Sequence, residues 1–243
     1  MEIRLPVNSD CSIKTDNDWA NIKMDRTQEL IGEIVSHPET SETDGRTYEL
    51  LKEYYRGGPT ESLRILLSSD DDRVAGEAAW IASELGESGK PLLSDIGGLL
   101  KHRSKKVRFW SIDYILLCAT AANGRELAST VVLVDDPEEA VRWKVMGFLA
   151  MASREQLQAA LTYSETSESA HAKELNWLLS PQGADPILII EELHNNDARR
   201  RKFAVAAAYR VAEQDRSPLN DAAASIDDLD VAQFARDMLK RLG

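Results

Sequence analysis

Large aromatic side chains stand beside charged ones in three stretches of this sequence. The aromatic members are Trp80, Phe109, Trp110 and Trp143, and their charged neighbours are Glu77, Glu84, Asp113 and Lys144. The face of an aromatic ring attracts a cation, and a carboxylate pairs with one. Such a set could hold the lysine or arginine side chains of a basic partner. We therefore take these eight residues as the candidate binding site.

The sequence shows no pattern typical of catalysis. It lacks a glycine-rich phosphate loop, a dinucleotide fingerprint, a nucleophile elbow and a paired-histidine helix. The histidines are His37, His102, His171 and His194. None has a carboxylate or cysteine at the spacing of metal ligands, and the two cysteines, Cys11 and Cys118, suit neither a disulfide framework nor a zinc site. We expect no enzymatic activity, no cofactor and no metal.

A basic run, Arg199-Arg200-Arg201-Lys202, lies at a predicted helix start, where positive charge is mildly unfavourable. One interpretation is a contact with an anion or an acidic partner. The other is pairing within the chain, with nearby acids such as Glu191, Glu192 and Asp197. We favour internal pairing, because exposed charge runs are commonly solvated surface.

The aromatic residues are positioned by a helix that recurs along the chain. Between residues 71 and 86, Val74, Ala78, Ala82 and Leu85 form an apolar stripe at helical spacing, with aspartates at its start and Gly86 at its end. Val107, 33 residues after Val74, opens a similar stretch, and Val141, 34 residues after Val107, opens another. Weaker copies surround Ala170, Arg200 and Val231. A period in this range indicates a helical repeat array.

A shorter helix fits before each copy, so the sequence predicts about six helical pairs. Their ranges are 61–68 with 71–85, 91–100 with 104–121, 127–132 with a helix whose first turn holds Pro137, 156–163 with 169–179, 186–194 with 197–212, and 218–225 with 228–242. Helices at 18–36 and 47–56 precede them. We expect residues 1–58 to form an N-terminal extension and helical cap, and 59–243 one continuous array. Residues 1–15 could be an extended cap or loose chain.

The recurring helix resembles the second helix of a HEAT repeat. The resemblance is carried by Asp71, Val74, Ala78-Ala79, Ala82 and Leu85-Gly86, and by the valine–arginine pairs Val107-Arg108 and Val141-Arg142. Ala75 replaces the arginine in the first copy, and Ala170 and Arg200 replace the valine later. The resemblance implies an all-α, right-handed α-solenoid whose second helices line a concave face. HEAT arrays are mostly protein-binding scaffolds and only occasionally enzymes.

The position of each aromatic residue in its copy predicts where it points. At about 100° per residue, the valine position and those one, four and eight residues later share the buried side. Phe109 and Trp143, two residues after the valine, and Trp80 and Asp113, six after it, point away from that side. We expect them on the concave face; the alternative is that they pack beneath a neighbouring helix. Trp19 and Trp177 we assign to the core or the cap.

The net charge of −12 limits the classes of partner that we expect. Sequence-blind nucleic-acid binders need a basic footprint, so we expect no nucleic acid and instead a basic protein. With no charged-then-apolar leader and no membrane-length apolar run, we expect no membrane association and a cytoplasmic location.

The expected function is therefore non-enzymatic protein binding through the concave face. By analogy of size and charge, immunity or antitoxin-type inhibitors that cover a basic toxin, such as a nuclease, look like this chain. Two alternatives stay open. The stretch from Phe109 to Asp113 resembles the aromatic-plus-aspartate motif of HEAT-like DNA glycosylases of the alkylation-repair type, although Phe109 stands where that motif has tryptophan. The chain could also be a general scaffold or adaptor.

Overall fold

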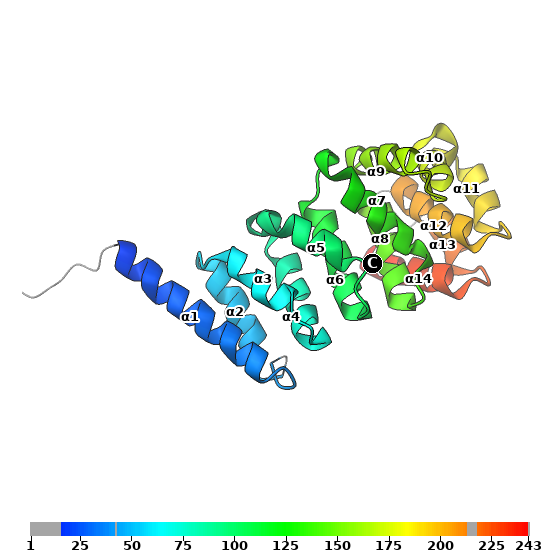
Figure 1. Ribbon diagram of the computed structural model, residues 1–243. Coiled ribbons are helices and arrows are strands. Elements are labelled where there is room, and N and C mark those ends of the chain that lie inside the picture. The colour runs from blue at the N-terminus through cyan, green and yellow to red at the C-terminus, as the bar shows by residue number, and fades with distance from the viewer. Residues whose placement is uncertain (1–15, 42, 213–217, 243) are drawn as a thin grey trace, which may run out of the picture.

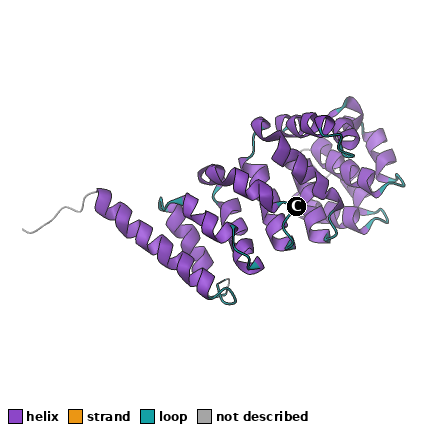
Figure 2. Cartoon of the chain, viewed as in Figure 1, coloured by secondary structure: helices purple, strands orange, loops and turns teal. Residues whose placement is uncertain are grey.

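The computed structural model describes residues 16–41, 43–212 and 218–242, and in these ranges the chain consists of helices joined by loops and turns, without β-strands (Figure 2). Helical pairs follow one another across the molecule, from α1 at one end to α9–α13 at the other (Figure 1). The expectations for residues 1–15 lie outside the described residues, as does the side chain of Trp19. The division at residue 58 stays a prediction.

The predicted helices are present, with small shifts of their ends, although α7 packs mainly on α9 rather than on its predicted partner α8. The first helices are α3 (Arg64–Leu67), α5 (Leu93–Leu99), α7 (Gly124–Val132), α9 (Arg154–Thr166), α11 (Pro186–Leu193) and α13 (Pro218–Ala224). The second helices are α4 (Asp72–Glu84), α6 (Lys105–Cys118), α8 (Glu139–Met151), α10 (Ala172–Leu179), α12 (Ala198–Ala212) and α14 (Leu229–Leu242). They are preceded by α1 (Asp16–Ser36) and α2 (Arg46–Tyr55). Short 3₁₀ turns are η1 (Thr60–Leu63), η2 (Gly86–Leu92), η3 (Ala121–Asn123), η4 (Leu133–Asp135) and η5 (Pro181–Ala184).

The ends of α4 and the start of α8 follow from local hydrogen bonds and backbone conformation. The Asp71 side chain accepts a hydrogen bond from the backbone N–H of Arg73 at 2.8 Å and so caps the start of α4. Gly86 follows the helix with a φ of +52°, a left-handed conformation that favours glycine. Pro137, however, lies before α8 rather than in its first turn, because the Asp136 side chain bonds the Glu138 N–H and the helix begins at Glu139.

The buried side of α4, α6 and α8 is the one that the spacing predicts, whereas Ala170 before α10 is exposed and Arg200 of α12 is half-buried. Val74, Ala78 and Ala82 of α4 have at most 1% of their surface exposed, and Val107 and Val141 are fully buried. Packing α4 on α6 and α6 on α8 covers these residues and removes their apolar surface from water.

Beyond α8 the second helices no longer pack on one another in the order of the chain. The next helix against α8 is α12, and α14 also packs on it, whereas α10 packs on α9 and α12. The sequence at α10 explains the difference, because Ala170 and His171 replace the valine and arginine of the earlier copies and the helix has only 8 residues. The chain thus brings α14 to α8 across 88 residues, through the ion pair of Arg142 with Asp230.

An arginine at the start of α6, α8 and α12 joins each of these helices to a later part of the chain. The ion pairs are Arg108 with Asp136, Arg142 with Asp230, and Arg201 with Asp228. Each guanidinium also donates to two backbone carbonyls in the turn before its own helix. Each arginine therefore closes the turn before its own helix and also holds the start of a later helix, which is α8 for Arg108 and α14 for Arg142 and Arg201.

Within the described part of the chain, none of the helices combines the length and the apolar character that crossing a bilayer requires.

Candidate binding surface

The four predicted aromatic residues lie along one face formed by α4, α6 and α8. Trp80, Phe109, Trp110 and Trp143 are each partly buried, and both Trp80 and Trp143 pack against the main core while keeping part of their surface in solvent. We call these four residues the aromatic face. Trp177 packs partly buried against the core, as expected.

The centre of the aromatic face is held by a lysine of the chain itself. The rings of Phe109 and Trp110 meet edge to face, with centroids 5.0 Å apart. Lys144 Nζ lies 4.1 Å from the Phe109 centroid and 5.6 Å and 5.8 Å from those of Trp110 and Trp143. It also donates a hydrogen bond to Asp113 Oδ2 at 2.6 Å. These five residues form one cluster that joins α6 to α8.

This cluster changes the predicted role of its charges. We expected Asp113 and Lys144 to meet a partner, but they meet each other. An ammonium that is both ion-paired and stacked on aromatic rings has little left to offer a partner. Its effect is instead to fix the orientation of the Phe109 and Trp110 rings.

The two predicted glutamates also differ from expectation. Glu77 is only 4% exposed and accepts a hydrogen bond from Lys106 Nζ at 2.7 Å, because α6 covers it. Glu84 is exposed at the end of α4, and its backbone carbonyl accepts a hydrogen bond from the Tyr55 hydroxyl. Neither Glu77 nor Glu84 belongs to the cluster that Phe109, Trp110, Asp113, Trp143 and Lys144 form.

Two hollows flank the Phe109–Trp110 pair. The first has a volume of about 190 Å³ and lies between α2, α4 and α6; it is lined by Thr47, Tyr48, Glu77, Trp80, Lys106 and Trp110. The second has a volume of about 470 Å³ and lies between α6, α8 and α14; it is lined by Lys105, Phe109, Glu138, Glu139, Ala140, Trp143, Gln233 and Asp237. Trp110 forms a wall of the first hollow and Phe109 forms a wall of the second. The Phe109–Trp110 pair therefore lies between the two hollows.

Sequence reasoning missed several residues of this surface. Tyr48 comes from α2, and Gln233 and Asp237 come from α14. Position within a repeat indicates the face of one helix, but it does not tell which distant helix closes the groove beside it. The acidic pair Glu138-Glu139, next to the copy that begins at Val141, is the feature that the sequence did offer.

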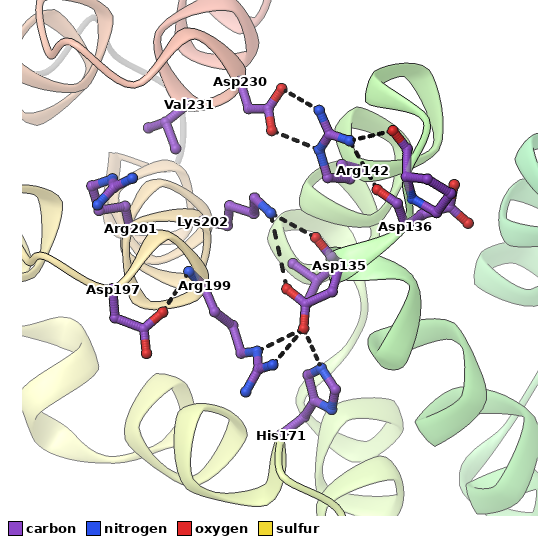
Figure 3. A network of polar contacts seen from close by, with 12 residues as sticks. Asp135, Asp136, Arg142, His171, Asp197, Arg199, Arg201, Lys202, Asp230 and Val231 are labelled. Carbon is purple, nitrogen blue, oxygen red and sulfur yellow. Dashed lines mark hydrogen bonds and ion pairs between the residues drawn. The ribbon is translucent and has the colours of Figure 1, made fainter.

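The basic run pairs internally, as favoured. Arg200 bonds Glu192 at 2.9 Å, one of the predicted partners. Arg199 instead bonds Asp135 at 2.6 Å, and Lys202 donates to the Val134 carbonyl (Figure 3). The fourth member, Arg201, pairs with Asp228.

Asp135 is the centre of a network of polar contacts with His171, Arg199 and Lys202 (Figure 3). This network joins η4 to the start of α10 and to α12. Its Oδ2 accepts from Arg199 and lies 3.1 Å from His171 Nε2. Burial alone would raise the pKa of the Asp135 carboxyl, but the hydrogen bonds from Arg199 and His171 outweigh it and hold the pKa below its usual value. Among the described residues, no group of three or more histidines, cysteines and acids lies together as metal ligands would.

Acid should weaken the Asp135 network. Because the folded pKa lies below the unfolded value of about 3.9, the contacts stabilise the fold at neutral pH, and their contribution is lost as pH falls through the folded pKa. Asp135→Asn should therefore lower the free energy of unfolding at pH 7, and the difference from the parent should shrink toward pH 2. Urea unfolding at several pH values measures it. Asp70→Asn, at an exposed carboxylate, is the control, and a pH-independent Asp135→Asn effect would contradict the assignment.

Comparison with known proteins adds little to this picture. No protein-family model and no curated protein sequence matches the chain. Among solved structures, two crystal structures of engineered proteins from a structural genomics consortium are similar to it. One is 14% identical with a TM-score of 0.41, over 95% of this chain and 92% of that one. The other is 17% identical with a TM-score of 0.45, over 95% of this chain and 94% of that one.

Proposed function

We propose that the chain is a HEAT-like repeat protein that binds another protein through its aromatic face. In this proposal the helical pairs form a right-handed α-solenoid, and α4, α6 and α8 line its concave side. The repeat spacing of the sequence and the successive packing of α4, α6 and α8 support it. The observation that carries it is the pair of aromatic-walled hollows on adjacent helices, since partly exposed tryptophans dominate interface energies.

The proposed partner is a basic protein. The net charge of −12 favours fast association with a positive surface. An immunity or antitoxin-type inhibitor is the form of this proposal that we favour: the chain would cover the active-site surface of a basic toxin, such as a nuclease, and block it sterically. This part rests on analogy of size and charge. A general scaffold would use the same surface without a toxin, and the neighbouring genes distinguish the two.

The alternative of a DNA glycosylase has less support. That chemistry would require a carboxylate available to a cationic nucleotide. The Asp113 carboxylate is instead held by Lys144 at 2.6 Å. The charge of −12 also opposes binding to DNA phosphates.

Replacing Trp80 and Trp143 together with alanine should abolish capture of the partner. Each hot-spot truncation costs at least about 2 kcal/mol, so the pair should weaken binding by more than about 100-fold. The measurement is titration calorimetry with the purified basic protein that the adjacent gene encodes, or with the protein that co-purifies with the parent chain.

The matched control is Ile65→Ala with Ile187→Ala, which removes two side chains that are 51% and 69% exposed on α3 and α11, outside the helices that form the aromatic face. It should bind like the parent. Circular dichroism establishes that each variant is folded. Unchanged affinity in a folded Trp80→Ala/Trp143→Ala variant would reject the proposed surface.

A further inference from the structure

We propose that the hollow between α6, α8 and α14 is the seat of an arginine side chain of the basic partner. The inference rests on the proposed protein-binding function and names the chemistry that one part of the surface recognises. Its support comes from the walls of the hollow, from the charges around it and from the contrast with the neighbouring hollow.

The aromatic walls of this hollow are held in place before any partner arrives. Phe109 is fixed by the Lys144 ammonium 4.1 Å from its ring centroid. Trp143 is backed by the fully buried Phe234, whose ring centroid lies 5.8 Å away at an interplanar angle of 66°. Rigid aromatic walls lose little conformational freedom on binding and present faces on which a planar cation can stack.

The charges around the hollow favour a cation. Glu138, Glu139 and Asp237 line it, against the single ammonium of Lys105. Lys105 pairs with Glu138 at 3.0 Å and Lys240 with Asp237 at 3.1 Å, so Glu139 is the carboxylate in excess. Asp237 accepts a hydrogen bond from Gln233 and pairs with Lys240, and these contacts lower the pKa of its carboxyl, so it is ionised at neutral pH.

The neighbouring hollow provides the contrast. Its two charged members, Glu77 and Lys106, neutralise each other at 2.7 Å, and its other walls include Trp80 and Trp110. That hollow suits an apolar side chain. The partner's cation is therefore assigned to the α6–α8–α14 hollow alone.

Arginine fits this hollow better than lysine. The guanidinium is flat and stacks on rings, and its fork of donors reaches two carboxylates at once. It is also more weakly hydrated than an ammonium, so it loses less on entering an aromatic cleft. Glu139 on α8 and Asp237 on α14 supply carboxylates from different helices around the hollow.

The test titrates the whole chain with Nα-acetyl-argininamide and follows the indole N–H signals by NMR, with the Trp143 signal assigned from Trp143→Phe. Citrullinamide, its neutral isostere, and lysinamide, both acetylated alike, are compared at equal ionic strength. We expect a saturable shift of the Trp143 signal with the arginine probe, absent with the citrulline probe and at least tenfold weaker in affinity with the lysine probe. The Trp80 signal should not move.

Glu139→Gln with Asp237→Asn should weaken the arginine probe at least tenfold. Glu165→Gln with Glu191→Gln removes the same charge from exposed positions elsewhere and should leave binding unchanged. No saturable shift, an equal response to citrulline, or an equal loss in the control variant would each overturn the inference. If the arginine probe does not bind but the Trp80→Ala/Trp143→Ala variant still loses the partner, the assignment of an arginine to this hollow is wrong and the proposed function stands. If the probe binds but that variant keeps the partner, the proposed function is wrong.

Discussion

Replacing Asp136 with alanine is expected to lower the free energy of unfolding by about 3–5 kcal/mol. The carboxylate bonds Arg108 through both oxygens, at 2.7 and 2.8 Å. The two side chains are only 3% and 9% exposed. The substitution leaves a buried guanidinium without its counter-charge, and it also removes the hydrogen bond that the Asp136 side chain accepts from the Glu138 N–H at the start of α8. Denaturant unfolding followed by circular dichroism measures the change.

Asp72→Ala is the matched control. Asp72 also pairs with an arginine, Arg103 at 2.8 Å, but these side chains are 42% and 73% exposed. Exposed pairs contribute at most about 1 kcal/mol, so this variant should remain close to the parent. Restoring charge balance with Arg108→Met in the Asp136→Ala background should recover part of the loss. Equal effects of Asp136→Ala and Asp72→Ala would show that burial of the first pair does not matter.

Phe234→Ala is the second change with a large expected effect, again about 3–5 kcal/mol. The Phe234 ring is completely buried and packs against Trp143, so it is an apolar contact that helps to hold α14 on α8. Truncation leaves a cavity at this junction and removes the support behind one wall of the second hollow. Affinity for the arginine probe should fall together with stability.

Leu229→Ala on the same helix provides the comparison, because that side chain is 80% exposed and should change stability by less than about 0.5 kcal/mol. Urea unfolding gives both values. A Phe234→Ala variant as stable as Leu229→Ala would mean that α14 is held by other contacts, such as the pair of Arg142 with Asp230.

The helices were predictable because their signals are local. Apolar spacing indicates the buried side of α4, α6 and α8, and Asp71 and Gly86 mark the ends of one of them through hydrogen bonding and backbone conformation. The internal pairing of the basic run was also accessible, since an acidic chain offers many partners. Glu192 was among the predicted partners, but Asp135 and Asp228 were not, because they lie far from the run in sequence.

The candidate site was predictable in part. The direction of Trp80, Phe109 and Trp143 follows from their own helices, but what covers each one depends on how neighbouring helices are offset. Lys144 reaches Asp113 because α8 lies beside α6 in one register, and a shift along the axis would separate them. Glu77 is buried for a similar reason, since Lys106 extends over it.

The docking of α14 on α8 has a consequence for how the chain acquires its structure. During synthesis α4 and α6 can associate soon after both emerge, because their contact is short in sequence. The surface of α8 that carries Arg142 and Trp143 is covered only after Asp230 and Phe234 of α14 have been synthesised. Closing so long a loop is entropically slower than local pairing. Until α14 arrives, that surface is exposed to unwanted association, and the nascent protein is most vulnerable at the helix on which its proposed binding surface depends.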